Sequence, residues 1–454
     1  MVLLNVNAFK IHIKEEDHMK TFQLPEDFLF GSATASLQIE GGDRHNNWYR
    51  FCEEGKTEDG SHCIEAADHW NRYEEDIDLM TQLHQDTYRM SVEWSRIEPR
   101  LGHFVDSALE HYRTEIELLL EKGIRPLVTL HHFSNPIWFE DMGGWANKDA
   151  VLWFDRFVRK VVFALGDLVQ DWVTINEPNV YLEGTYSAGN FPPNKPNFFN
   201  FFKAAKYMVR AHIRAYESIH EIRRDKNHPG KTMVGAAHHL RVFDIDHKSP
   251  GGILPASMMD HVFHNIFLEG MVHGKFIFPI GNGGYPLGKG PYCDFMGVNY
   301  YSRDIIRFSY NPLRLFGELT VKEDTEVNDL GWEIYPEGLY RVCKKVYETY
   351  PFPIYITENG ISDLKDEQRG KFIFDHLQVI KQLIDEGVPV ERYYHWSLID
   401  NFEWELGLEP KFGLIEVDYH TQKRTIRESG KFYGEVSKSG GVTEEMIDKY
   451  SFLN

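Results

Sequence analysis

Cysteine is scarce in this chain of 454 residues, which holds four: Cys52, Cys63, Cys293 and Cys343. So few thiols in so long a chain do not make a disulfide scaffold, and their spacing matches no zinc site. The histidines show no ligand spacing either, beyond two adjacent pairs that are poor chelates on a strand. The sequence therefore predicts no metal, no organic cofactor, and reduced thiols in a cytoplasmic protein.

An excess of positive charge and a long apolar run are lacking as well. The formal net charge of -20 argues against binding to nucleic acid or to anionic lipid. No segment is apolar for long enough to cross a membrane, and the mildly apolar run 2–9 lacks the basic region and cleavage site of a signal peptide. We expect residues 1–18 to form a flexible N-terminal extension and residues 19–454 to form one domain, with a homo-oligomer left open.

What the sequence has in abundance is short apolar runs separated by helical patterns. The runs are nearly all apolar, as expected for parallel strands covered on both faces. They are Phe28–Ala33, Thr87–Val92, Pro126–His131, Trp172–Asn176, Met233–His238, Phe295–Tyr300, Ile354–Thr357 and Arg392–Ser397. Eight such strands alternating with helices predict an α/β fold, a single (β/α)8 TIM barrel. The alternative, an open doubly wound sheet, usually has a glycine-rich phosphate turn early in the chain, and this sequence has none.

One of the intervening helical patterns has both of its ends marked. Apolar residues recur at helical spacing from Leu109 to Leu119. Asp106 stands where an N-cap is expected, and Gly123 stands where the helix should end. The pattern therefore predicts a helix between these two residues.

Polar residues follow the predicted strands at the points where the strands end. The C-terminal ends of barrel strands meet at one face of the molecule, which is where this fold carries its active sites. The residues at these points are His131 and His132, Asn176 and Glu177, Asn299 and Tyr301, Glu358 and Asn359, and Trp396. We expect their side chains to converge at one rim.

Two glutamates stand out among these strand ends. Glu177 follows an apolar strand that Pro178 stops, and Glu358 follows another, with Gly360 placed to allow a turn. Taken singly, either glutamate is as well explained as a helix cap or as the partner of an arginine. Together they end the fourth and seventh of eight strands, so they can face each other across the barrel mouth. Facing carboxylates suit glycoside hydrolysis, in which one protonates the leaving oxygen and the other attacks the anomeric carbon.

Seven motifs, in this order, resemble those of family 1 of the glycoside hydrolases. They are FLFGSATAS from Phe28, YRMSVEWSRI from Tyr88, TINEP from Thr174, MGVNYY from Met296, GWEIYPEG from Gly331, ITENG from Ile356 and WSLIDNFEW from Trp396. The resemblance runs from about Phe22 to about Phe432. It implies a cofactor-free β-glycosidase that acts on terminal, unphosphorylated β-D-glycosides with retention, through a covalent glycosyl-enzyme. A β-glucosidase is expected first, with β-galactosidase and β-fucosidase activity left open.

The resemblance also implies roles for individual residues. Glu358 matches the nucleophile and Glu177 the acid/base, while Arg89 and Tyr301 match groups that hydrogen-bond the nucleophile. The residues assigned to substrate binding are Gln38, His132, Asn176, Asn299, Trp332, Trp396, Glu403 and Trp404. Among these, Trp396 is expected beneath the sugar and Trp332 on the aglycone side. The plainer alternative is that Trp396, Trp404 and His132 belong to the core and that Arg89 forms a structural ion pair.

Two departures from the family pattern bear on the substrate. Many relatives have His-Trp-Asp-Leu-Pro where this chain has His132-Phe-Ser-Asn-Pro136, so Phe133 lacks an indole N–H that would bond the sugar. The segments 137–139 and 198–202 are unusually apolar. They either line an apolar entrance for the aglycone or pack against the outer helices.

Three other functions share parts of this site. A 6-phospho-β-glycosidase would need a serine, a lysine and a tyrosine where this chain has Glu403, Pro410 and Phe412, and a carboxylate there repels a phosphate. A non-catalytic sugar-binding relative would have lost a carboxylate, whereas both are present. A transglycosylase has the same residues and differs in whether water or a sugar accepts the glycosyl group.

Overall fold

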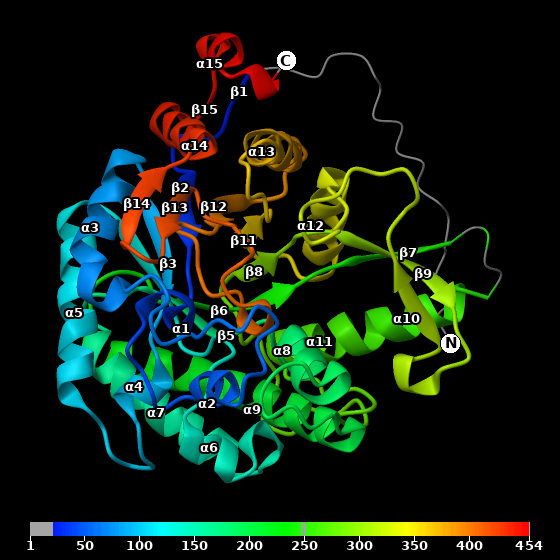
Figure 1. Cartoon of the computed structure of the whole chain (residues 1–454). Helices are drawn as coiled ribbons and strands as arrows, with labels where there is room; N and C mark the ends of the chain where they lie inside the picture. The colour runs from blue at the N-terminus through cyan, green and yellow to red at the C-terminus, as the bar shows by residue number, and fades with distance from the viewer. Residues whose placement is uncertain (1–20, 247, 249–250, 454) are drawn as a thin grey trace.

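Eight parallel strands close into a barrel at the centre of the protein (Figure 1). The structure is a computed structural model, which describes residues 21–246, 248 and 251–453. The barrel strands are β2 (Leu29–Ala33), β3 (Thr87–Ser91), β4 (Arg125–Thr129), β5 (Asp171–Asn176), β6 (Met233–His239), β8 (Met296–Asn299), β11 (Ile354–Gly360) and β12 (Val390–Trp396). Each corresponds to one of the eight predicted strands, so the predicted TIM barrel is confirmed. The predicted extension 1–18 lies outside the described residues, and the single domain 19–454 stays a prediction.

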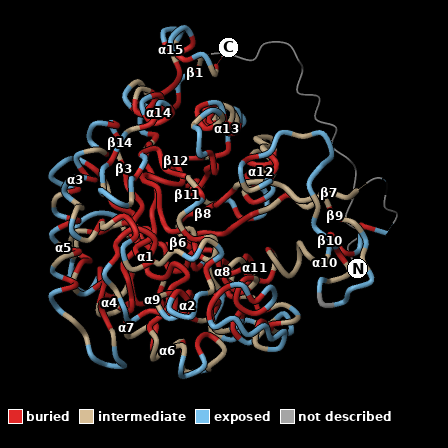
Figure 2. The backbone as a smooth tube through the Cα atoms, in the orientation of Figure 1, coloured by how far each residue is buried: buried red, intermediate tan, exposed pale blue. Residues whose placement is uncertain are grey.

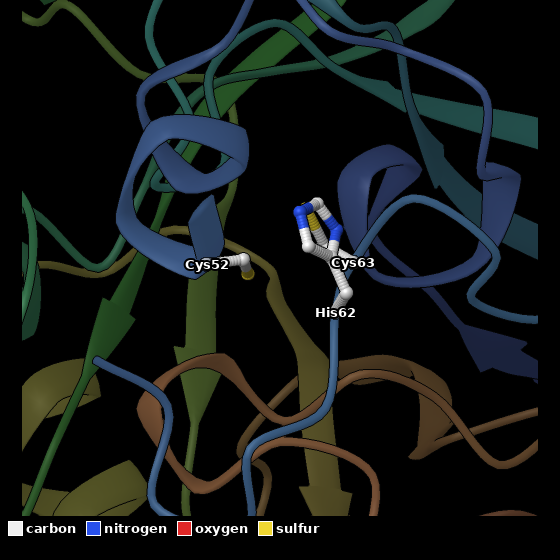
Figure 3. A group of neighbouring side chains, drawn as sticks. All are labelled: Cys52, His62 and Cys63. Carbon is white, nitrogen blue, oxygen red and sulfur yellow. The ribbon is translucent and has the colours of Figure 1, made fainter. Parts of the chain in front are cut away.

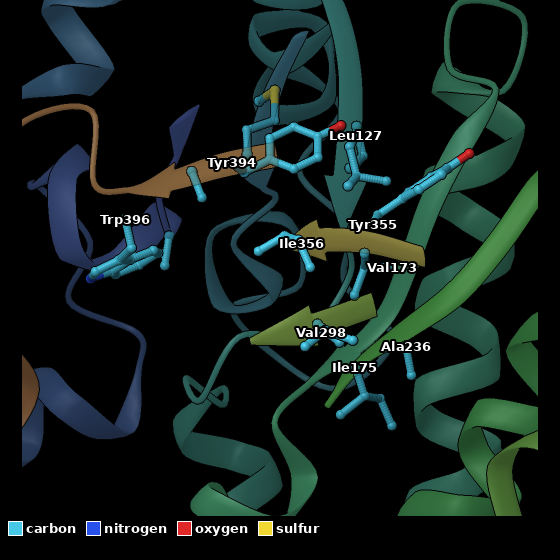
Figure 4. Packing of buried hydrophobic residues seen from close by; sticks show 14 of the residues in the cluster. Leu127, Val173, Ile175, Ala236, Val298, Tyr355, Ile356, Tyr394 and Trp396 are labelled. Carbon is cyan, nitrogen blue, oxygen red and sulfur yellow. The ribbon is translucent and has the colours of Figure 1, made fainter. Parts of the chain in front are cut away.

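The barrel strands are almost wholly buried, as the red of their backbone in Figure 2 shows. Figure 4 shows Leu127 of β4, Val173 of β5, Val298 of β8 and Ile356 of β11 among the core residues. All four are fully buried. Burial on both faces explains why these strands read as continuous apolar runs rather than alternating ones.

Helices form the outer layer around the barrel. The longer ones are α3 (His69–Gln82), α5 (Asp106–Glu121), α7 (Ala150–Leu165), α9 (Phe198–Asp225), α10 (Ile253–Asp260), α11 (Ile266–His273), α12 (Pro336–Thr349), α13 (Arg369–Asp385) and α14 (Glu428–Ser439). The shorter ones are α1 (Ser36–Glu40), α2 (Asn47–Glu53), α4 (Trp94–Ile97), α6 (Ile137–Asp141), α8 (Pro178–Leu182) and α15 (Glu444–Lys449). No helix in the described parts of the chain is both long and apolar enough to span a membrane.

The ends of α5 differ in part from the prediction. Val105 is the N-cap, and Asp106 is the first residue of the helix, with no capping hydrogen bond from its side chain. The Asp106 carboxylate instead accepts a hydrogen bond from Lys160 Nζ at 2.7 Å. Gly123 follows the helix with φ of 79°, a left-handed conformation that glycine adopts without a steric penalty.

Small sheets outside the barrel were not predicted. β7 (Val242–Ile245), β9 (Arg303–Phe308) and β10 (Gly317–Thr320) form one sheet, which lies to one side of the barrel in Figure 1. β13 (Ile415–Asp418) pairs with β14 (Lys423–Ile426), and β1 (Phe22–Gln23) pairs with β15 (Gly441–Val442). Arg303 of β9 reaches the wall of the cavity described next, so the first of these sheets extends the barrel mouth.

The pairing of the barrel strands is irregular close to both glutamates. The register between β5 and β6 shifts between Val173 and Asn176, just before Glu177. The register between β11 and β8 shifts between Ile356 and Glu358. Irregularities of this kind change the direction of the following side chain and are common beside active sites.

Candidate active site

Glu177 and Glu358 line the same cavity, which has a volume of about 370 Å³. Its wall also includes the predicted site residues His132, Tyr301, Trp332, Trp396, Glu403 and Trp404. Four further predicted residues, Gln38, Arg89, Asn176 and Asn299, are fully buried and contact the wall residues from behind. The structure thus brings all twelve predicted residues together around one cavity.

The backbone at Glu177 turns sharply at the end of β5. Glu177 has φ of 39° and ψ of 61°, a left-handed conformation that is uncommon for a residue with a side chain. Its N–H donates to the carbonyl of Ala237 on β6 at 2.8 Å. Pro178 is the first residue of α8, a position that suits proline because no intrahelical partner is needed there. The predicted strand stop at Pro178 is therefore also a helix start.

Glycine is required at position 360 for a different reason from the turn that the sequence predicts. It is the last residue of β11, and its φ is not positive, so no turn requires it there. A Cβ atom at this position would lie 1.8 Å from the carbonyl oxygen of Trp396 on β12. Glycine is needed because the two strands approach closely behind the glutamate.

Two side chains hold the Glu358 carboxylate. The Arg89 guanidinium forms an ion pair with Oε1, and the Tyr301 hydroxyl donates to Oε2 at 2.7 Å. Arg89 also donates to the Asn176 Oδ1 atom at 2.6 Å. Arg89 and Glu358 are nearly inaccessible to solvent, with 0% and 3% exposure. The charge of Glu358 is thus paired and hydrogen-bonded, as a buried carboxylate requires.

Glu177 is held by neutral donors. Its Oε1 atom accepts a hydrogen bond from Asn299 Nδ2 at 2.8 Å and lies 2.9 Å from His239 Nδ1. Arg241 Nε lies 3.2 Å from the other ring nitrogen of His239. An arginine N–H can only donate, so His239 Nε2 accepts and its proton lies on Nδ1. His239 therefore donates to Glu177, and both protein hydrogen bonds fall on Oε1.

The sequence reasoning did not select His239 as a site residue. The predicted fifth strand ends one residue earlier, at His238, and His238 and His239 form one of the two adjacent histidine pairs in the sequence. In the structure His239 is the last residue of β6 and lines the cavity. Applying the strand-end argument to the fifth barrel strand, as to the others, would have identified it.

The surroundings of the two glutamates shift their pKa values by different balances of effects. Burial raises the pKa of Glu177 to about 7, against a smaller lowering by the Asn299 hydrogen bond. Burial also raises the pKa of Glu358 to about 7, where the Arg89 charge opposes it and the Glu177 charge adds to it. Glu358 has the cation of Arg89 beside it, so Glu358 loses its proton first. The pair with one proton therefore has Glu358 ionised and Glu177 protonated.

His239 is neutral beside this pair. Burial, followed by the charge of Arg241, lowers its pKa to about 3. A neutral imidazole with its proton on Nδ1 donates one hydrogen bond and carries no charge to the site. The His239 ring stacks on the Tyr301 ring, with centroids 5.7 Å apart, and this contact fixes the orientation of the imidazole.

Two buried polar atoms near the cavity have no hydrogen-bond partner in the protein. Gln38 donates through Nε2 to the Phe402 carbonyl at 2.8 Å and to Glu403 at 3.3 Å, while its Oε1 atom is unpartnered. His132 Nε2 lies 3.0 Å from Asn176 Nδ2 and so accepts, which places its proton on the unpartnered Nδ1 atom. An acceptor and a donor left free in this way suit the hydroxyls of a sugar.

Aromatic rings make up much of the cavity wall. Trp396 stacks near His132 with centroids 5.7 Å apart, and Trp404 lies 5.1 Å from Phe133. Trp332 is 37% exposed and lies 5.8 Å from Tyr301, on the outer part of the wall. Phe133 lines the cavity, so at this position the wall has a phenyl ring in place of the indole N–H of many relatives.

The two apolar segments singled out in the sequence do not line this cavity. Phe139 is fully buried and packs on Trp94 and Trp145, with centroids 4.9 and 5.3 Å apart. Phe198 and Phe199 begin α9 and are 41% and 79% exposed. Phe139 therefore belongs to the packing of the outer layer, as the alternative held, whereas an apolar entrance formed by residues 198–202 stays a prediction.

Acidic groups dominate the charge of the cavity wall. Six carboxylates line it, from Glu177, Glu183, Asp304, Glu358, Glu403 and Glu405. The two wall arginines are already paired, Arg241 with Glu183 and Asp304 and Arg303 with Asp244 and Glu333. Among the described residues that line this cavity, no cation is therefore left to bind a phosphate group.

Comparison with known proteins agrees with this barrel. The model of glycosyl hydrolase family 1 matches residues 20–280 and 289–442. The chain is 34% identical to beta-glucosidase A from Thermotoga maritima over 463 residues, covering 94% of this chain and 100% of that protein. It is 31% identical to a beta-galactosidase from Pyrococcus woesei over 509 residues, covering 94% and 99%. The solved structure of a beta-glycosidase from Pyrococcus horikoshii superposes with a TM-score of 0.86 at 37% identity, covering 95% and 98% of the two chains.

The barrel and the cavity define a TIM-barrel enzyme with paired carboxylates at the C-terminal ends of its strands. The chain belongs to glycosyl hydrolase family 1, as its motifs indicated, and it is a β-glycosidase.

Proposed function

We propose that this enzyme is a retaining β-glycosidase that hydrolyses terminal, unphosphorylated β-D-glycosides, with a β-glucoside as its main substrate. The observation that carries the proposal is the unequal setting of two buried carboxylates in one cavity. Glu358 has a cation and a hydroxyl donor, and Glu177 has neutral donors. One group is thereby suited to act as an anion and the other as an acid.

In the first step, the ionised Glu358 attacks the anomeric carbon while Glu177 protonates the leaving oxygen. The proton of Glu177 belongs on Oε2, because Oε1 already accepts hydrogen bonds from Asn299 and His239. The products of this step are the free aglycone alcohol and a glycosyl ester of Glu358.

In the second step, Glu177 has lost its proton and acts as the base. It removes a proton from water, and the resulting hydroxide oxygen attacks the anomeric carbon and displaces Glu358. Two inversions at one carbon return the β-configuration. Retention by this route needs carboxyl groups about 5–5.5 Å apart.

The support for an unphosphorylated glycone is the charge of the cavity. Glu403 contacts Gln38 and Asn401 at 3.3 and 2.9 Å, and burial, with other carboxylates nearby, raises its pKa to about 8. A group in this setting can donate a hydrogen bond to a sugar hydroxyl or accept one from it. A phosphate dianion would find no unpaired cation among the described residues of the cavity wall, where Arg241 and Arg303 already have acidic partners. The predicted 6-phospho-β-glycosidase alternative is disfavoured for this reason. The preference for glucosides rests on the β-glucosidase among the relatives.

The experiment that tests the mechanism is NMR of the first product. Aryl β-glucoside is mixed with enzyme, and the anomeric proton is followed before mutarotation. The β-anomer is expected first, and early appearance of the α-anomer would contradict retention.

The substrate class is tested by comparing kcat/KM across nitrophenyl β-glucoside, β-galactoside, β-fucoside and 6-phospho-β-glucoside. The glucoside is expected to be the best substrate and the phosphorylated sugar the worst. Preferential turnover of the phosphorylated sugar would contradict the proposal. Failure to turn over any aryl glycoside would support a non-catalytic sugar-binding protein, and glycosyl transfer to added alcohols at the expense of hydrolysis would support a transglycosylase.

A further inference from the structure

Two cysteines and a histidine from outside the family motifs lie close together in the structure. Cys52 lies near the end of α2, and His62 and Cys63 lie on the segment that follows it (Figure 3). Both cysteines are buried and unpaired, and His62 is partly exposed. One ligand atom from each of the three side chains lies within 4.8 Å of the other two.

We propose that Cys52, His62 and Cys63 form a binding site for a thiophilic divalent cation, with Zn²⁺ as the natural occupant. Two thiolates and one imidazole are donors that select zinc over magnesium or calcium. Spacing alone did not predict this site, because Cys52 and Cys63 are too far apart in the chain for a recognised zinc motif. The fold supplies the proximity that the sequence pattern lacks.

The geometry is close to that of a bound ion. With zinc–sulfur and zinc–nitrogen distances of about 2.3 and 2.0 Å, tetrahedral ligand atoms lie roughly 3.5–4 Å apart. Because the three ligand atoms all lie within 4.8 Å of one another, a contraction of at most about 1 Å is required, which rotation of the side chains can supply. Binding converts the two thiols to thiolates and releases two protons to solvent.

Neighbouring groups suit a cation at this place. Glu53 Oε1 lies 3.2 Å from His62 Nε2, and a carboxylate beside a histidine in this way commonly orients a metal ligand. The other ring nitrogen, Nδ1, accepts the Ile64 N–H at 3.0 Å, so an ion bound to His62 would take the place of that hydrogen bond. The His62 side chain is 27% exposed, which leaves one side open for entry of the ion and for a water as fourth ligand.

The proposed site would join two segments that support the sugar-binding turn. The Asp59 carboxylate, between the ligands in sequence, accepts the Leu408 N–H at 2.6 Å, and Glu58 N–H donates to the Glu405 carbonyl at 2.7 Å. Trp48 of α2 packs against Trp404 with ring centroids 5.0 Å apart. An ion that links α2 to this segment would hold both against the turn that carries Glu403 and Trp404.

The test uses the full-length enzyme after chelation and reduction. Titration with Co²⁺, a spectroscopic substitute for zinc, is expected to give an ultraviolet thiolate-to-metal charge-transfer band that saturates at one ion per chain, and Zn²⁺ should displace it. Zn²⁺ should also raise Tm, because an ion that binds the folded protein stabilises it.

Variants assign the band to these residues. Cys52→Ser and Cys63→Ser should abolish it, and His62→Asn, at a partly exposed position that does not threaten folding, should weaken binding at least about tenfold. Cys343→Ser is the matched control, since that thiol is also buried but lies on α12. No band in the wild-type enzyme, a band that survives Cys52→Ser and Cys63→Ser, or one lost equally in Cys343→Ser would overturn the proposal. Because metal binding is measured without substrate, the result is independent of the proposed glycosidase mechanism.

Discussion

Replacing Glu177 by glutamine should inactivate the enzyme and yet stabilise it at alkaline pH. Glutamine matches the protonated form of Glu177. Its Oε1 atom can keep the hydrogen bonds from Asn299 and His239, while its amide takes the place of the protonated oxygen. The variant therefore removes only the cost of an ionised carboxylate in a buried site.

The size of the gain follows from the pKa of Glu177. Burial moves it from 4.5 to about 7, so between these pH values the unfolded chain loses a proton that the folded chain keeps. The free energy of unfolding of the wild type consequently falls as pH rises through this window, by about 3 kcal/mol in total. Glutamine does not titrate and escapes this loss. For a chain of this length, about 3 kcal/mol corresponds to roughly 3 °C in Tm.

The assay is Tm by scanning calorimetry at one scan rate, at pH 5 and pH 8.5, for the wild type and Glu177→Gln. Most of the stabilisation should be present at pH 8.5 and little of it at pH 5. The matched control is Glu409→Gln, which removes the same charge from an exposed residue a few positions after Trp404. It should change Tm little at either pH. An equal Tm difference at both pH values would refute the reasoning, because the effect would then not come from titration of Glu177.

Three further substitutions test the assigned roles through kinetics. Glu358→Ala should reduce kcat by several orders of magnitude, since it removes the attacking group, and substantial remaining hydrolysis would exclude that role. Glu177→Ala should reduce kcat/KM by about 10²–10⁴-fold for glycosides with poor leaving groups and far less for activated aryl glycosides, and equal losses for both would count against proton donation. His239→Ala should move the alkaline limb of the kcat/KM profile to higher pH, because it removes a donor that favours ionised Glu177. A lower rate with an unmoved limb would show that His239 is only structural.

The barrel was predictable because its strands are buried on both faces. That burial makes each strand a continuous apolar run, and β3 and β5 match their predicted ranges to within one residue. The sheet of β7, β9 and β10 has no such signal. Its strands are short and partly exposed. The pairing of β7 with β9 joins segments far apart in the chain, whereas β9 and β10 are antiparallel and joined by a short connection. Asp106 could not be placed as cap or first helical residue from sequence, because either position suits an acidic side chain.

The site was predictable to the extent that each residue ends a strand or belongs to a motif. The two apolar segments were harder to place, because periodicity shows that a helix has an apolar face but not what that face contacts. Phe139 proved to contact Trp94 and Trp145 rather than the cavity. The atoms Gln38 Oε1 and His132 Nδ1 show a further limit, since only coordinates reveal that a polar atom is left without a partner.

One hydrogen-bond network connects the different donors of the two glutamates. Asn176 Oδ1 accepts from Arg89 at 2.6 Å and from Asn299 at 3.1 Å, and these two donors also contact Glu358 and Glu177 respectively. Any shift of Asn176 would move the cation away from one carboxylate and the amide away from the other. Asn176 thus lies between the groups that must exchange charge during the reaction, although it contacts neither carboxylate in these hydrogen bonds. Its effect on catalysis would come through Arg89 and Asn299 as well as through the substrate-binding role that the family resemblance implies for it.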